Sequence, residues 1–150
     1  MIRGKLFLGA LFGFLTLLIT CQLFAQAEVI EQRQKLMKSN GEATKAIKAA
    51  AAAKDYATVQ AKAKDIIANG DKVLDIFRKE ATQGKTKAKP EIWDKWEEFS
   101  KNPAKVKKAA SELADAAKSK DDGAITVKVK ALGEACASCH KVFRAEKYAE

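Results

Sequence analysis

Apolar residues recur at steps of three and four along most of the chain, which is the spacing of one face of an α-helix. From residue 29 onward this pattern predicts helices at 29–54, 56–80, 90–120 and 124–148. We predict no strand in the chain. Four amphipathic helices joined by short connectors predict an all-α fold, an antiparallel four-helix bundle.

Turn residues and charged stretches separate the four predicted helices. Residues 81–89 are basic and lack an apolar anchor, so we expect an exposed loop there. Pro90 suits the first turn of the third helix, since a helix leaves its first N–H groups unpaired. Asn102-Pro103 interrupts the third helix, and Asp-Asp-Gly at 121–123 predicts the last turn.

The first predicted helix carries a face of unusual composition. Arg33, Met37 and Gly41 follow one another at steps of four. A glycine inside a helix costs about 1 kcal/mol relative to alanine, and close approach of a bulky group would explain its presence. A methionine in a helical stripe is most often part of a core. Packing and contact with a bound group therefore both stay open for Met37.

The last helix is expected to present its apolar residues toward the core. Ile125, Val129 and Leu132 follow at helical steps, and Val127 and Val142 extend the apolar face. The helix therefore has an inner side that continues toward the end of the chain.

Residues 1–27 differ in composition from the rest and are typical of a secretory signal peptide. Two basic residues precede the apolar run 6–19, and Ala25-Gln26-Ala27 is a small-x-small cleavage pattern. We predict a cut after Ala27, which leaves one domain, residues 28–150. The alternatives are an uncleaved membrane anchor, for which the apolar run is short, and a lipid on Cys21, to which the preceding threonine is poorly suited.

The chain has 150 residues and a net charge of +9, carried mainly by lysines. Lysine excess favours docking on acidic patches of partner proteins, because opposite charges raise encounter rates. Ordinary solvated lysine faces on helices explain the same charge equally well. We expect no nucleic-acid partner, no stable membrane insertion after cleavage, and a monomer or homodimer.

The residues that carry chemistry lie near the C-terminus, in Cys136-Ala137-Ser138-Cys139-His140. Helical spacing places the two cysteines and the histidine on one face. This is the C-x-x-C-H pattern of covalent haem attachment. The thiols can add to the two vinyl groups of a haem, and the imidazole can reach the iron. Export agrees with this interpretation, because c-type haem is attached outside the bacterial cytoplasm.

Three other interpretations of the cysteine pair stay open at this stage. A zinc site needs a fourth ligand, and with Cys21 removed and His140 the sole histidine, a carboxylate would have to supply it. A thioredoxin-type pair needs a βαβ setting. A disulfide between residues three apart closes a very short loop and gains little stability.

The chain resembles the class II c-type cytochromes, the cytochrome c′ family. The resemblance covers residues 28–150. It rests on C-x-x-C-H followed by Phe143-Arg144 in the last helix, on residues 33–38 with Gly41 in the first, and on Pro90-Glu91-Ile92-Trp93 at the start of the third.

The resemblance implies a covalently bound haem, one per chain, inside the bundle. It implies that Cys136 and Cys139 form the thioethers and that His140 is the proximal iron ligand. It places Arg33 at a haem propionate and Arg144 near the proximal face. A guanidinium can pair with such a carboxylate through two parallel hydrogen bonds.

Met37 determines which branch of the family the chain resembles. Arg-x-x-x-Met in the first helix is similar to the low-spin cytochrome c-556 type, in which this methionine is the sixth iron ligand. That branch implies a periplasmic electron carrier, not an enzyme, which meets redox partner proteins. The alternative is a five-coordinate cytochrome c′ that binds nitric oxide or another small gas. A structural or stress-related periplasmic protein is a third possibility.

Overall fold

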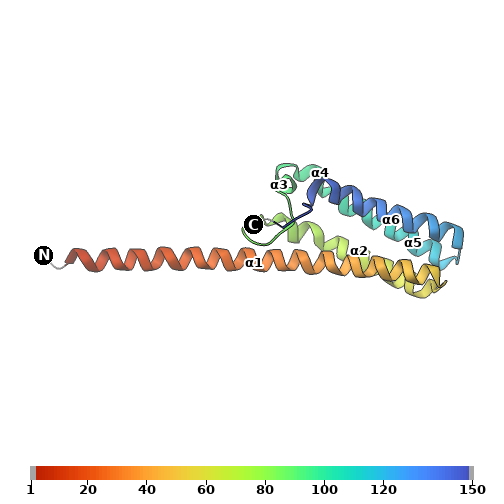
Figure 1. Cartoon of the computed structure of the whole chain (residues 1–150), viewed down its shortest axis with the longest axis horizontal. Coiled ribbons are helices and arrows are strands. Elements are labelled where there is room, and N and C mark those ends of the chain that lie inside the picture. The colour runs from red at the N-terminus through yellow and green to blue at the C-terminus, as the bar shows by residue number, and fades with distance from the viewer. Residues whose placement is uncertain (1–2, 149–150) are drawn as a thin grey trace.

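The computed structural model describes the backbone of residues 3–148 and the side chains of residues 24–148. Helices α1, α2, α5 and α6 form an antiparallel four-helix bundle, and the short α3 and α4 lie at one end of it (Figure 1). The predicted all-α bundle is confirmed. The helices in these residues are α1 (Arg3–Ala52), α2 (Tyr56–Arg78), α3 (Glu91–Asp94), α4 (Trp96–Ser100), α5 (Asn102–Lys118) and α6 (Asp122–Phe143).

Helix α1 is much longer than predicted and projects beyond the bundle at its N-terminal end (Figure 1). Residues 20–30 contain neither proline nor glycine, so nothing in that stretch ends the helix. The predicted cleavage site after Ala27 therefore lies within α1. The side chains of residues 1–23, and with them the alternative lipid site at Cys21, lie outside the described part. Where side chains are described, no helix combines the length and apolar character that a bilayer span requires.

Two clusters of buried side chains hold the bundle together, and they differ in the size of their residues. Small side chains let helix axes approach closely, whereas large ones keep them apart. The alanine-rich cluster is Ala43, Ile47, Ala50, Val59, Ala63, Ile66, Ala109, Ala110, Leu113, Ala114, Ala116, Ala117, Ile125 and Leu132. The second, the aromatic cluster, is Leu36, Val73, Phe77, Ile92, Phe99 and Phe143.

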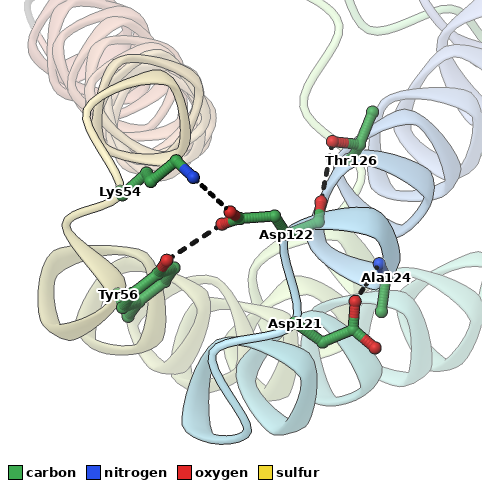
Figure 2. A network of polar contacts seen from close by, with 6 residues as sticks. All are labelled: Lys54, Tyr56, Asp121, Asp122, Ala124 and Thr126. Carbon is green, nitrogen blue, oxygen red and sulfur yellow. Dashed lines mark hydrogen bonds and ion pairs between the residues drawn. The ribbon is translucent and has the colours of Figure 1, made fainter.

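Polar contacts join the α1–α2 turn to the start of α6, beside the alanine-rich cluster (Figure 2). The Asp122 carboxylate accepts hydrogen bonds from Lys54 Nζ at 2.6 Å and from Tyr56 Oη at 3.0 Å. Asp121 caps α6, since its Oδ1 accepts a hydrogen bond from the Ala124 backbone N–H at 2.9 Å. These contacts fasten the end of the first helix pair to the beginning of the last helix.

The predicted third helix consists of three pieces. The break at Asn102-Pro103 is confirmed, since α4 ends at Ser100 and α5 begins at Asn102. The buried Asn102 side chain donates hydrogen bonds to the carbonyls of Glu98 and Phe99. These carbonyls lie at the C-terminal end of α4, so Asn102 supplies partners for them there. A further break at Lys95 was not predicted; its backbone leaves the helical region there.

The expectation of an exposed loop at 81–89 is wrong in part. Ala81 is 1% exposed and Thr86 is 5% exposed, so the loop is anchored at two points. Ala88 also forms an isolated antiparallel bridge with Arg144. Alanine and threonine carry too little apolar surface for a sequence pattern to mark them as anchors.

Helix α6 ends at Phe143, earlier than the predicted end at 148. Arg144 is extended, and the Ala145 backbone N–H donates to the Lys87 carbonyl at 2.8 Å. Tertiary pairing with the loop therefore replaces the last helical turn. Val127 was expected to extend the apolar face of this helix, but its side chain is 63% exposed.

We predict that Asp122→Asn lowers the thermal unfolding midpoint at pH 7, because the ion pair with Lys54 is lost. The hydrogen bonds from Lys54 and Tyr56 hold the pKa of Asp122 below its usual range. Stability from such a carboxylate is present above its unfolded pKa of about 3.9 and is lost as the pH falls through the lower folded value.

Melting curves of both proteins should therefore differ at pH 7 and converge in strong acid. Asp115→Asn is the control, since Asp115 is exposed and makes no ion pair in the described residues. If both substitutions lowered the unfolding midpoint equally at pH 7, the stabilising role of the Asp122–Lys54 ion pair would be contradicted.

Candidate haem site

A cavity of about 910 Å³ opens between α1 and α6, with walls from α2, the 86–92 segment and the start of α5. α1 and α6 pack against each other less extensively than the other neighbouring pairs of long helices. The volume lies in the range of cofactor pockets. The structure brings all six predicted site residues to this cavity: Arg33, Met37, Cys136, Cys139, His140 and Arg144.

Helix α6 supplies the two thiols and the imidazole. Burial raises the pKa of the Cys136 thiol, and burial together with the neighbouring Cys136 raises the pKa of Cys139 to about 11. Burial lowers the pKa of His140, and the positive charge of Arg144 one turn later lowers it further. The imidazole is therefore neutral at pH 7, which is the form that binds a metal.

The structure bears on the three other interpretations of the cysteine pair: a disulfide, a zinc site and a thioredoxin-type pair. Cys136 and Cys139 are both free, so no disulfide joins them. Between residues 24 and 148, no three His, Cys, Asp or Glu side chains gather in a way that could hold a metal ion. Residues 3–148 contain helices and a single isolated bridge, which excludes a βαβ setting for that part of the chain.

Helix α1 supplies the opposite wall. The helix has two buried sides: Leu36 and Ile47 lie in the core, whereas Met37, Gly41 and Thr44 line the cavity. A Cβ on Gly41 would meet no atom within 4 Å, so the space beside Met37 is open. Met37 packs against the aromatic cluster, as Cys139 of α6 does.

The Arg33 side chain is buried, with 3% of its surface exposed. Its guanidinium binds backbone carbonyls at the C-terminal end of α2. Nη1 donates a hydrogen bond to the Ala81 carbonyl at 2.9 Å, Nε donates to the Ile76 carbonyl at 3.4 Å, and Nη2 donates to the Lys79 carbonyl. A positive charge at the C-terminus of a helix is favourable, because the last carbonyls there lack partners. Nε, Nη1 and Nη2 of Arg33 thus all donate to backbone carbonyls. The contact of Arg33 with a haem propionate stays a prediction.

Aromatic rings enclose the same guanidinium. The Arg33 Cζ lies 5.1 Å from the Phe77 ring centroid and 5.0 Å from the Trp93 centroid. Burial lowers the pKa of Arg33 to about 10, and the charge of Glu80 partly offsets this. Arg33 remains a cation at pH 7, and it joins α1 to α2 and α3 one turn before Met37.

Sequence reasoning missed two parts of the cavity wall. The loop residues Thr86, Lys87 and Ala88 line it, although the loop was expected to be exposed. Three lysines of α1 also line it, at positions 38, 45 and 48. These lysines are seven and three residues apart, which places them on the same side of the helix as Gly41. Helical spacing in the sequence could therefore have identified them.

Comparisons with known proteins agree with this arrangement. The sequence model of the family described as cytochrome c′ matches residues 28–144. The chain belongs to the cytochrome c′ family. It is 34% identical over 148 residues to cytochrome c′ of Rhodospirillum rubrum, an alignment that covers 95% of this chain and 99% of that protein.

Solved structures of cytochrome c′ share the fold. The protein from Thermochromatium tepidum is 26% identical and superposes with a TM-score of 0.71, over 81% of this chain and 98% of that one. A nitric oxide complex of a variant from Alcaligenes xylosoxidans superposes with the same TM-score of 0.71 at 19% identity, over 81% and 97% of the two chains. At that identity the likeness concerns the fold alone.

Membership of the cytochrome c′ family implies a covalent c-type haem, and the cavity fits one. Its walls present two thiols and a neutral imidazole at the spacing of the attachment motif. In the described residues the His140 imidazole donates and accepts no hydrogen bond, so its ring nitrogens are available to a metal. Cys136 and Cys139 would hold the haem, His140 would bind the iron, and the bound iron would supply a one-electron couple.

We predict that Cys136→Ala/Cys139→Ala removes covalent haem. Intact mass spectrometry of the exported wild-type protein should show the polypeptide plus one haem, and the double variant should show the polypeptide alone. The variant should also unfold more easily, because the cavity loses a large apolar filler. Ser138→Ala is the matched control, since it keeps both thiols and His140. Haem retained by the double variant through denaturation would contradict the attachment.

We predict that Arg33→Ala lowers the free energy of unfolding by about 2 kcal/mol, because three carbonyls at the end of α2 lose their donor. It should also lower the reduction potential, since it removes a positive charge beside the cavity that favours the reduced iron. Urea unfolding and redox titration measure the two effects. Arg78→Ala is the control, since Arg78 is an exposed residue at the end of α2 whose guanidinium stacks on the Trp96 ring. Equal stability losses in both variants would contradict the role of Arg33.

Proposed function

We propose that the protein is a periplasmic electron carrier whose haem iron is bound by His140 on one side and Met37 on the other. The observation that supports this most is that Met37 of α1 and His140 of α6 line the same cavity. A His/Met-ligated haem has no open coordination position, and methionine raises its potential. Such a site suits electron transfer rather than catalysis, and cytochrome c′ proteins are generally not enzymes.

The surroundings of Met37 suit a fixed ligand. Met37 and Cys139 pack against one aromatic cluster, which sets the position of α1 relative to α6. Within it the Phe99 ring lies 5.3 Å from both the Phe77 and the Phe143 centroids. Rings in tight contact resist displacement. The two ligating helices would therefore change position little when the charge of the iron changes.

This ligation would place the chain in the low-spin cytochrome c-556 branch. A neutral thioether is compatible with both ferric and ferrous iron. The chain's own role would be to keep Met37 at the iron and water away from it. The apolar side chains of Val73, Ile92 and Phe99 on the cavity wall support that role.

Gas binding by a five-coordinate haem is the second candidate, and the comparisons with known proteins favour it over His/Met ligation. The curated relatives are named cytochrome c′, and a nitric oxide complex is known for a protein of the same fold. The open space beside Gly41 adjoins Met37. If Met37 only packs against the haem, a diatomic ligand would enter there.

We also propose that residues 1–27 direct export and are removed. Cytochrome c′ proteins are periplasmic. A cut after Ala27 leaves every α1 residue of the cavity wall in the mature chain, since the first of them is Arg33. The intact mass measured for haem attachment also reports this cut, and a mass that still includes residues 1–27 would contradict it.

We predict that Met37→Leu converts a low-spin ferric absorption spectrum to a high-spin one and opens the ferrous protein to carbon monoxide. Leucine keeps most of the apolar volume and removes the sulfur, so the change isolates ligation from packing. The potential should fall. Leu36→Met is the control, since Leu36 is a buried neighbour that does not line the cavity. A wild type that is already high-spin and binds carbon monoxide would favour the gas-binding function.

A further inference from the structure

The charged side chains of the cavity wall all carry the same sign. Six of its residues are cationic, and none of the lining residues in the described part of the chain is an aspartate or glutamate. The chain has 19 acidic residues, so the wall excludes a residue type that is common elsewhere. The cationic residues are Arg33, Lys38, Lys45, Lys48, Lys87 and Arg144.

Three of these cations form a row on α1, which we call the α1 lysine row: Lys38, Lys45 and Lys48. All three are exposed, and they lie where the cavity meets the solvent. In the described residues Lys45 and Lys48 make no ion pair, and Lys38 makes one long contact with Glu42 at 3.8 Å. Ten residues of helix extend over roughly 15 Å. The row is therefore an extended, largely unneutralised positive surface.

The fold itself does not compensate this charge. Lys45 and Lys48 are like charges three residues apart on one helix, which is unfavourable for the helix alone. A haem carries two carboxylates, so it would neutralise at most two of the six cations. The remaining charge is most simply matched by an anionic surface from outside the molecule.

We infer that the α1 lysine row is the docking surface for an acidic redox partner protein. This rests on the proposed electron-carrier function, because an electron leaves most readily where the cavity opens to solvent. The length of the row exceeds any small anion, and exposed lysines lack the convergent, buried donors of a small-anion site. Long, mobile ammonium groups suit an extended face of carboxylates, whose attraction steers the encounter.

The test compares two double charge reversals in the haem-loaded protein. Lys45→Glu/Lys48→Glu alters the row. Lys64→Glu/Lys72→Glu changes the net charge equally on α2, at exposed lysines that do not line the cavity and make no ion pair in the described residues. Circular dichroism and the absorption spectrum of each variant verify that the bundle and the haem site persist.

The first measurement is binding of a deca-glutamate peptide, an extended acidic probe, by calorimetry at low ionic strength. The row variant should bind about tenfold more weakly and the α2 variant less than about threefold, and the difference should disappear in strong salt. Equal losses in both variants would mean that net charge alone acts, and this would overturn the docking surface.

The second measurement is oxidation of the reduced protein by hexacyanoferrate(III) in a stopped-flow instrument. One electron passes from the ferrous haem to the oxidant, giving ferric haem and hexacyanoferrate(II). The row variant should react about tenfold more slowly at low salt, and the α2 variant should stay close to wild type. A slower reaction without weaker peptide binding would indicate a small-anion site only, and this would also overturn the proposal.

These outcomes are separable from those for Met37. A high-spin wild-type spectrum would refute His/Met ligation whatever the lysine variants do. Peptide binding depends on the surface and not on the sixth ligand, so it decides the docking surface in either case.

Discussion

The unequal size of the buried side chains at the two ends of the bundle is the constraint on which the site depends. Alanines bring the four long helices close together at the end where the α1–α2 and α5–α6 turns meet. Phenylalanine and other large side chains keep the helices apart at the end that carries α3 and α4. A cavity in a bundle with uniform packing would collapse or need strained rotamers. Here the separation of α1 from α6 is built from well-packed side chains.

Polar contacts then fix the elements around the cavity. Arg33 joins α1 to the end of α2 and to the rings of Phe77 and Trp93. The Ala88–Arg144 bridge turns the chain away from α6 immediately after Phe143. Each contact supplies partners for backbone groups at a helix end, which would otherwise be costly to bury. The same residues therefore complete the helices and form the walls of the site.

The charge of the walls has opposite consequences for stability and for function. Clustered cations repel one another, and the few acidic residues near them on α1 give little electrostatic stabilisation in return. The same cations would favour the reduced, less positive iron and attract acidic surfaces. In the electron carrier that we propose, the cost to the isolated protein would be recovered when a partner docks.

The sequence by itself determined the features that depend on local periodicity. These are the helical class, the positions of α2 and α5, the break at Asn102, and the common face of Cys136, Cys139 and His140, because residues within one or two turns have relative positions set by helix geometry. The pairing of Met37 with the His140 cavity came from family resemblance and not from periodicity, since about a hundred residues separate them. Only the tertiary structure decided which face of α1 meets the core and which meets the cavity. It also decided that the 81–89 loop is anchored, that α6 ends at Phe143, and that Arg33 serves backbone carbonyls. Each of these depends on contacts between segments far apart in the chain, whose relative positions are set by the packing of whole helices.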